Sequence, residues 1–314
     1  MHVSKEITDT ITERYLSGYD KDYVRPYVDY FLSKWPDSIE AIVFYGSCLS
    51  EGTKKETSTP DFFILTESYG KFHKNLIHSI LNAILPPNTY SICSSKLKGK
   101  YNVLSIRDFQ RETSLRAKDI YNLGRLSKRT ALLYTRNDEI KEMMINSFAG
   151  AYSTVATKSI FLMPEVFSLD DFIKKCLRIS YIGEHRVEAD DKISKLLDSE
   201  RQFYTSIYAS ILKDLVKLGR LKEGDGIYVQ NGTEKFPYKL KRCATKIFLR
   251  KSVIRAKLRW PKSIYTFKGW ADVLIAKIER AKGIKIKLSE KEKKYPLIYG
   301  WKYYFKLKKD KMIK

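Results

Sequence analysis

Two short apolar runs separated by a polar loop constrain the fold of this chain most strongly. Residues 41–45 (AIVFY) end abruptly at Gly46-Ser47, and residues 60–67 (PDFFILTE) begin a second run at Asp61. Short β-branched and aromatic runs bounded by turn residues predict strands. A glycine at a strand end lets the backbone approach a ligand, and neighbouring N–H and hydroxyl groups bind phosphate oxygens. The sequence therefore predicts two strands with Gly46-Ser47 facing Asp61.

The spacing of these residues is similar to that of polymerase-β-like nucleotidyltransferases. Thirteen residues separate Ser47 from Asp61, which fits the Gly-Ser, spacer, Asp pattern of those enzymes. The resemblance implies that Asp61 holds Mg²⁺ against nucleotide phosphates. The usual second carboxylate two residues later is absent, because Phe63 stands there. The alternative is a simple strand-ending turn with Asp61 as a loop cap.

The positive charge lies almost entirely in the last quarter of the chain. Of the net +23, residues 235–314 carry 26 Lys and Arg against 5 Asp and Glu, whereas residues 1–234 carry 33 against 31. Such a region predicts an anionic partner, either nucleic acid or an acidic membrane face. The four cysteines and four histidines show no zinc or disulfide spacing, which favours a reducing compartment.

Hydrophobic periodicity predicts mixed helices and strands up to about residue 136 and mainly helices afterwards. One expected helix covers residues 69–85, and the glycines of residues 222–232 predict a turn region. We predict an α/β (α+β) fold in three parts: residues 1–136, 137–235 and 236–314.

Three further segments, together with the Gly-Ser and Asp stretch, are similar to one family. They are residues 100–105 (KYNVLS), 123–128 (LGRLSK) and 163–186, where MPEVFS is followed by ISYIGEHR. Their order resembles the translocator assembly and maintenance protein family, the peripheral mitochondrial-type phosphatidate cytidylyltransferases. This chain departs from the family at Cys48 and Asn102, where the family usually has glycine.

The resemblance implies a polymerase-β-like nucleotidyltransferase domain, a helical winged-helix-like domain, and CTP in the cleft between them. It implies transfer of cytidylate from CTP to phosphatidic acid, with Mg²⁺ and release of pyrophosphate. The first 20 residues carry four acids and few cations, which argues against a secretory signal or mitochondrial presequence. We therefore expect a bacterial relative, cytoplasmic and peripheral on the inner face of the cell membrane.

The expected catalytic residues lie in the first domain. Gly46 and Ser47 are expected to bind the β- and γ-phosphates, and Asp61 to be the principal Mg²⁺ ligand. Glu67 is a candidate second metal ligand, but it lies roughly 20 Å along the strand, so a solvated loop carboxylate is the alternative. Lys100 is expected on the strand beside Asp61, where it would neutralise the triphosphate.

Further binding residues are expected around the domain junction. Arg125 and Lys128 would clamp the triphosphate or the phosphatidate headgroup, unless they and the next arginine form a solvated face. Tyr181 would stack on cytosine. Glu184 and Arg186 would orient the substrates, and a structural ion pair between them is the alternative.

The basic region interleaves 13 aromatic residues with its cations. Residues 268–282 have the pattern of an interfacial amphipathic helix. The aromatic and apolar residues 295–301 (YPLIYGW) suit a position at the depth of the lipid headgroups. We predict that residues 236–314 attach the protein to an anionic membrane. A small basic domain that packs its aromatics internally and a surface for single-stranded RNA are the alternatives.

The leading prediction is a membrane-peripheral phosphatidate cytidylyltransferase without a specific nucleic acid partner. The rivals are a nucleotidyltransferase acting on RNA or a small cytosolic acceptor, and a non-catalytic basic adaptor. The sequence does not predict the oligomeric state.

Overall fold

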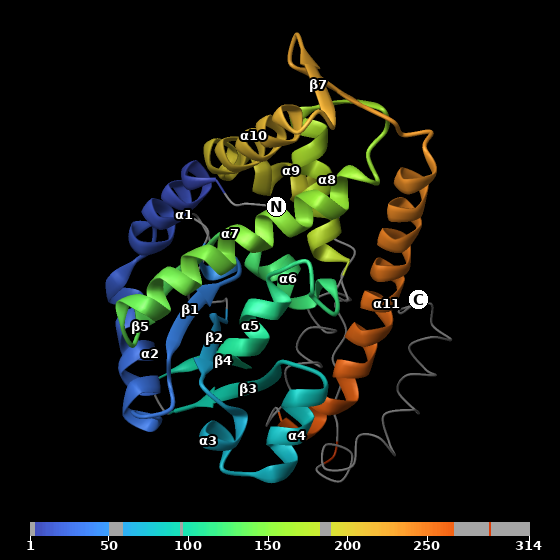
Figure 1. Cartoon of the computed structure of the whole chain (residues 1–314). Coiled ribbons are helices and arrows are strands. Elements are labelled where there is room, and N and C mark those ends of the chain that lie inside the picture. Colours follow the sequence, from blue (N-terminus) through green and yellow to red (C-terminus); the bar gives the residue numbers. More distant parts are fainter. Residues whose placement is uncertain (1–3, 50–58, 95–96, 183–189, 267–288, 290–314) are drawn as a thin grey trace.

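The computed structural model describes residues 4–49, 59–94, 97–182, 190–266 and 289. Its centre is a five-stranded mixed sheet with the order β3-β4-β2-β1-β5 (Figure 1). β2 and β4 are parallel, and the other neighbouring pairs are antiparallel. The mixed α/β fold class is confirmed. The strands are β1 (Ala41–Tyr45), β2 (Asp61–Thr66), β3 (Asn88–Cys93), β4 (Lys98–Ser105) and β5 (Thr130–Thr135).

Both faces of the sheet are covered by helices, because successive strand residues point to opposite sides and both sets are apolar. Val43 and Phe63 join one buried cluster, whereas Phe44 and Phe62 join another on the opposite face. The second face is covered by α2 (Lys21–Lys34) and the short helix that follows β2. The helices of the first face are α1 (Lys5–Ser17), α5 (Ile106–Glu112), α6 (Ile120–Leu126) and α7 (Asp138–Ile160).

After α7, the described part of residues 161–235 adds three helices and a small sheet. The turn region predicted at residues 222–232 is a β-hairpin instead. Its turn is Asp225-Gly226, both at positive φ, which is the two-residue turn that suits a hairpin. The three-stranded sheet has the order β6-β8-β7. These elements are β6 (Val166–Ser168), α8 (Leu169–Tyr181), α9 (Asp190–Ser199), α10 (Arg201–Lys217), β7 (Leu221–Gly224) and β8 (Ile227–Gln230).

The first two predicted parts share one continuous core. Tyr15 of α1 and Tyr152 of α7 are fully buried and share a hydrogen bond of 2.9 Å between their hydroxyls. Tyr204 and Tyr208 of α10 belong to the same cluster. The N-terminal helix therefore packs on β5, before residue 136, and on α7 and α10, after it. The three-part division stays a prediction.

The prediction of a single helix over residues 69–85 is wrong. The chain forms α3 (Tyr69–His73) and α4 (Leu76–Ile84) with a break between them. Lys74 takes the left-handed conformation, with φ of 49°, and the Asn75 side chain accepts a hydrogen bond from the backbone N–H of His78. This Asn75 cap starts a new helix in a new direction.

The first part of the basic region is a long helix that packs on the body. α11 (Phe236–Thr266) runs along one side of the molecule and reaches α4 (Figure 1). Arg255 and Arg259 bind the buried carboxylate of Asp119, and the Ser252 hydroxyl accepts the backbone N–H of Ile120. Within the described residues, none of the helices has the length and apolarity needed to span a bilayer. The predicted membrane segments 268–282 and 295–301 lie outside the described residues.

Candidate active site

The end of the sheet where β1 stops and β2 starts brings the first predicted residues together. Tyr45 pairs with Asp61 across the antiparallel strands, so Gly46 begins the loop beside that carboxylate. Gly46 has a φ of 90°, which strains any residue with a side chain, and a Cβ placed there would lie 3.4 Å from Oδ2 of Asp61. Gly46 and Ser47 are both exposed. Their exposed backbone therefore adjoins a half-buried carboxylate.

Lys100 lies on the neighbouring strand at the level of Asp61. The parallel pairing of β2 with β4 makes the two residues direct partners, and the backbone N–H of Lys100 donates to Pro60 at 2.9 Å. Directly paired residues point to the same face of a sheet, so a cation and an anion share this edge. The predicted position of Lys100 beside Asp61 is what the structure shows.

A tyrosine that the sequence reasoning did not select lies beneath this edge. The Tyr45 ring stacks on Phe63 with centroids 4.6 Å apart, and its hydroxyl accepts a hydrogen bond from Nδ2 of Asn102 at 2.5 Å. Asn102 in turn accepts the Thr89 hydroxyl at 2.6 Å. In the sequence, Asn102 is distinguished only as a departure from glycine. Its side chain fixes Tyr45, and no local sequence signal connects residues so far apart.

Lys128 and Tyr181 meet from opposite sides of the predicted domain junction. Lys128 lies two residues before Thr130, the β5 partner of Tyr45. Its ammonium lies 3.6 Å from the centroid of the Tyr181 ring, at the end of α8. This is a close cation–π contact. It joins the helical part of the chain to the loop that enters the sheet at the Asp61 end.

Gly124 makes this meeting possible. A Cβ at Gly124 would lie 2.2 Å from the carbonyl oxygen of Ser180, which is a severe clash with backbone. Only glycine therefore lets α6 approach the end of α8 this closely. The glycine of the LGRLSK segment thus positions Lys128 against Tyr181.

The other two cations near Lys128 have different partners. Arg125 turns back on its own helix, where Nη1 donates to the Tyr121 carbonyl at 2.9 Å and the guanidinium stacks on the Tyr121 ring. Arg129 is nearly buried and forms an ion pair with Glu200, which also binds Arg14 at 3.0 Å. Arg129 is therefore a structural residue, which the sequence did not reveal because Glu200 is remote.

The remaining predicted residues do not join this group. Glu67 lies past the opposite end of β2, is exposed, and forms an ion pair with Lys71 at 3.0 Å. The structure therefore does not bring Glu67 to Asp61. Glu184 and Arg186 lie outside the described residues.

The residues at this edge can supply only part of the coordination of a magnesium ion. The described residues contain no cluster of three or more His, Cys, Asp or Glu that could hold a metal. Mg²⁺ in nucleotide enzymes is commonly held by one or two carboxylates, with phosphates and waters as the other ligands. The half-buried carboxylate of Asp61 beside the exposed Gly46 backbone suits that limited role.

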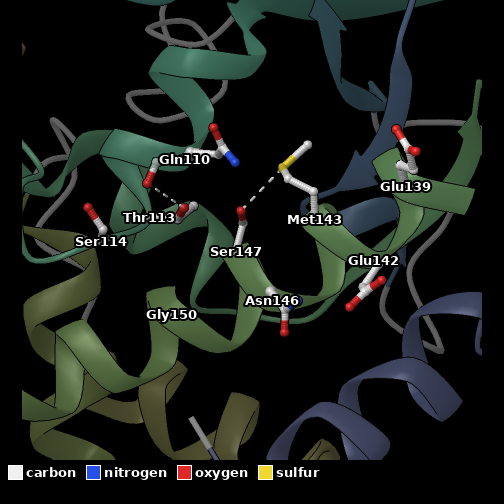
Figure 2. Close-up of a pocket in the computed structure, with 9 residues that line it drawn as sticks. All are labelled: Gln110, Thr113, Ser114, Glu139, Glu142, Met143, Asn146, Ser147 and Gly150. Carbon is white, nitrogen blue, oxygen red and sulfur yellow. Dashed lines mark hydrogen bonds between the residues drawn. The ribbon is translucent and has the colours of Figure 1, made fainter. Parts of the chain in front are cut away.

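A separate depression of about 510 Å³ lies between α5 and α7 (Figure 2). It contains none of the predicted site residues. Glu139 and Glu142 line it, in the first turns of the helix that follows the far end of β5. Two carboxylates disfavour a triphosphate here. The depression is therefore not the candidate nucleotide site.

Comparison with known proteins identifies a family over the middle of the chain. The family described as "Phosphatidate cytidylyltransferase, mitochondrial" matches residues 87–247, just over half of the chain. Proteins of that name from Caenorhabditis elegans and Caenorhabditis briggsae are each 24% identical, over 207 and 208 residues. Each match covers 58% of this chain and 63% of the relative, so the chain spans a little under two thirds of either relative.

Solved structures were also matched. One of them is that of a nucleotidyltransferase-like protein from Exiguobacterium sibiricum 255-15, with 10% identity. The match covers 76% of this chain and 91% of that chain, with a TM-score of 0.28.

These comparisons correct one expectation. The expected location of a bacterial enzyme, cytoplasmic and on the inner face of the cell membrane, is wrong. The matched family and both relatives carry the description mitochondrial. The acidic composition of residues 1–20 was therefore a misleading guide to location.

Proposed function

This chain belongs to the mitochondrial phosphatidate cytidylyltransferase family, and on that premise we propose that it transfers CMP from CTP to phosphatidate and releases pyrophosphate. The observation that carries the proposal is the shared edge of Gly46, Ser47, Asp61 and Lys100. Lys128, two residues before the β5 partner of Tyr45, contacts Tyr181 of the helical part. The proposed site lies between residues 1–136, as the nucleotidyltransferase domain, and residues 137–235, as the winged-helix-like domain.

The residues of the proposed site would bind the phosphates of CTP through charge and its base through stacking. The backbone N–H groups of Gly46 and Ser47, which are both exposed residues, would bind phosphate oxygens. Lys100 and Lys128 would balance the triphosphate charge. The Tyr181 ring, already in contact with a cation, would offer its face to cytosine. A change at any of these side chains should therefore alter the affinity for CTP.

The proposed chemistry is an in-line displacement at the α-phosphorus of CTP. A phosphatidate oxygen forms the new P–O bond as the bond to the β-phosphate oxygen breaks, and pyrophosphate leaves. Phosphate monoesters are largely ionised near neutral pH, so the attack needs no strong general base. Asp61 would hold Mg²⁺, which when bound neutralises charge on the phosphates. Lys100 would keep the nucleotide in line with its acceptor.

We also propose that residues 236–314 keep the enzyme on an anionic membrane, where phosphatidate lies. The outward side of α11 exposes Leu240, Ile247, Ile254 and Leu258 at helical spacing. Lysines and arginines flank this stripe at Lys239, Lys246, Arg250 and Lys257, and all four are exposed. Apolar side chains flanked by cations suit the interface of an anionic bilayer.

The proposal is tested by incubating the purified chain with labelled CTP, Mg²⁺ and phosphatidate vesicles. A lipid-soluble cytidine product that requires phosphatidate is expected. Label transferred to RNA, or to a water-soluble acceptor, would favour a different nucleotidyltransferase. No incorporation with any acceptor, under conditions where the chain is folded, would favour the non-catalytic adaptor.

A further inference from the structure

α4 exposes its apolar side chains and buries a polar one. Leu76, Ile77, Ile80 and Ile84 are 75%, 68%, 48% and 66% exposed, although the helix has only nine residues. Asn82 is fully buried instead. Contiguous exposed apolar side chains on a soluble surface usually mark a site of interaction.

Polar contacts rather than apolar packing hold this helix in place. The side-chain Oδ1 of Asn82 accepts the backbone N–H of Asn88 at 2.6 Å, and its Nδ2 donates to the backbone carbonyl of Val103 at 3.1 Å. Nδ2 also lies 3.1 Å from Nε2 of His73. The helix is therefore fixed from its buried side, and its aliphatic side is left for another surface.

The sequence segments that contain α4 and α11 have no acidic residues. Residues 68–107 contain no Asp or Glu, but they contain five lysines and one arginine. Residues 235–271, which include α11, likewise contain no Asp or Glu. The aliphatic surface of α4 thus lies in a segment whose charge complements anionic lipid headgroups.

α4 and α11 are joined end to end. Nζ of Lys262 donates to the Pro87 carbonyl at 2.6 Å, and Nη2 of Arg259 donates to the Pro86 carbonyl at 2.8 Å. These carbonyls follow α4 directly, and Figure 1 shows α4 beside the C-terminal end of α11. Leu258 of the outer stripe lies one helical turn before Lys262. The apolar stripe of α11 therefore leads to the end of α4 that carries Ile84.

We infer that α4 inserts its aliphatic side chains into an anionic phospholipid bilayer, as a second membrane contact beside α11. The inference rests on the proposed function for the location of the substrate. The exposed side chains of α4 are aliphatic, which suits acyl chains, whereas single-stranded RNA is bound by stacking aromatics. If two copies of the chain paired through this surface, two cationic segments without acidic residues would face each other and repel. A bilayer is therefore the occupant that both the apolarity and the charge favour.

The test uses the full chain with Leu76→Glu and Ile80→Glu together. The matched control is Leu218→Glu, an equally exposed leucine at the end of α10. Co-sedimentation with phosphatidylcholine vesicles, with and without phosphatidate, reads binding directly. CMP transfer is measured toward vesicle phosphatidate and toward a short-chain, water-soluble phosphatidate.

The double variant should bind phosphatidate vesicles about tenfold more weakly, or worse, than the control. It should lose vesicle-dependent transfer to a similar degree and keep transfer to the soluble substrate. Unchanged vesicle binding would overturn the inference, whether or not the melting temperature or the molecular mass changes. Absence of transfer by the unmodified chain would overturn the proposed function instead, while sedimentation would still decide the role of α4.

Discussion

Two aspartates show how differently this chain uses a carboxylate. Asp119 is completely buried, and its Oδ2 lies 2.6 Å from Nε of Arg255 and 2.8 Å from Nη2 of Arg259. Asp61 is half-buried at the start of a strand, beside the exposed Gly46 backbone. The first joins α11 to α6, whereas the second adjoins solvent at an edge that other functional groups share. Burial and partners, rather than residue type, distinguish the structural carboxylate from the candidate catalytic one.

The comparison predicts its largest effect on activity at Asp61. Asp61→Asn should lower kcat by about a thousandfold or more, because it removes the anionic ligand proposed to place Mg²⁺ on the phosphates. The melting temperature should stay unchanged. Asp29→Asn, an exposed change on α2, is the matched control and should leave turnover intact. Near-native turnover of Asp61→Asn would remove Asp61 from the site.

The largest effect on stability is predicted at Asp119. Asp119→Asn leaves two arginines without their buried counter-charge, so the free energy of unfolding should fall by about 3–5 kcal/mol. Urea unfolding measures it, with Asp198→Asn as control. Asp198 pairs with Arg201 on the surface, and its loss should cost less than about 1 kcal/mol. Equal effects of both changes would break the distinction drawn here.

The same junction has a predictable acid dependence. Burial raises the pKa of Asp119, but Arg259 and Arg255 outweigh it and hold the pKa below the ordinary value of 3.8. A carboxyl with a lowered folded pKa contributes stability at higher pH and loses it as the pH falls through that folded pKa. Asp119→Asn should therefore show a weaker loss of stability below pH 3.8 than the unmodified chain. Superimposable acid curves would contradict this.

A smaller pH effect is predicted at His73, which supports α4. Burial, with His78 and Lys262 nearby, lowers the pKa of His73 to about 4 from 6.5. Nδ2 of Asn82 donates to Nε2 of His73, so this nitrogen must be unprotonated. Protonation of Nε2 would place its N–H donor against the N–H donor of Asn82. The folded state therefore binds fewer protons between pH 6.5 and 4, and stability should fall by about 2 kcal/mol as the pH drops through that window. His73→Gln keeps an acceptor without titrating and should flatten the decline, measured by urea unfolding; an unchanged decline would contradict the assignment.

The smallest predicted effects are those on the KM for CTP, and they distinguish Lys100 from Arg125. Lys100→Ala should raise the KM for CTP about tenfold, because it removes a charge-assisted phosphate contact. Arg125→Ala should change KM less than about threefold, since its guanidinium already stacks on Tyr121 and donates to that residue's carbonyl. Steady-state kinetics decide between them. A larger effect at Arg125 than at Lys100 would reverse their proposed roles.

The parts that sequence reasoning predicted depend on neighbouring residues and strand order. The sequence predicted that Gly46 and Ser47 lie beside Asp61 and that Lys100 lies on the neighbouring strand, because the apolar runs have recognisable ends. The break before α4 was missed because residues 69–85 keep an apolar pattern, while a single left-handed residue, Lys74, redirects the chain. Local conformational propensity does not predict this change in the direction of the chain.

The contacts of α11 were beyond the reach of the sequence. Asp119 lies 136 and 140 residues before its arginine partners, and cations in a strongly basic region are ordinarily solvated. The structure instead buries Arg259 and Lys262 against the loop after α4. Removing residues 236–314 would therefore disturb the body, so membrane attachment is better tested by point substitutions on the outer faces of α4 and α11.

The location of bound CTP tests the account most directly. A photoreactive CTP analogue can be cross-linked to the full chain with Mg²⁺, and the labelled peptides mapped by mass spectrometry. Labelling is expected in the peptides that contain Gly46-Ser47, Lys100 and Tyr181, and unmodified CTP should compete with it. Competed labelling confined to the lining of the depression between α5 and α7, at Gln110 and Glu142, would contradict it.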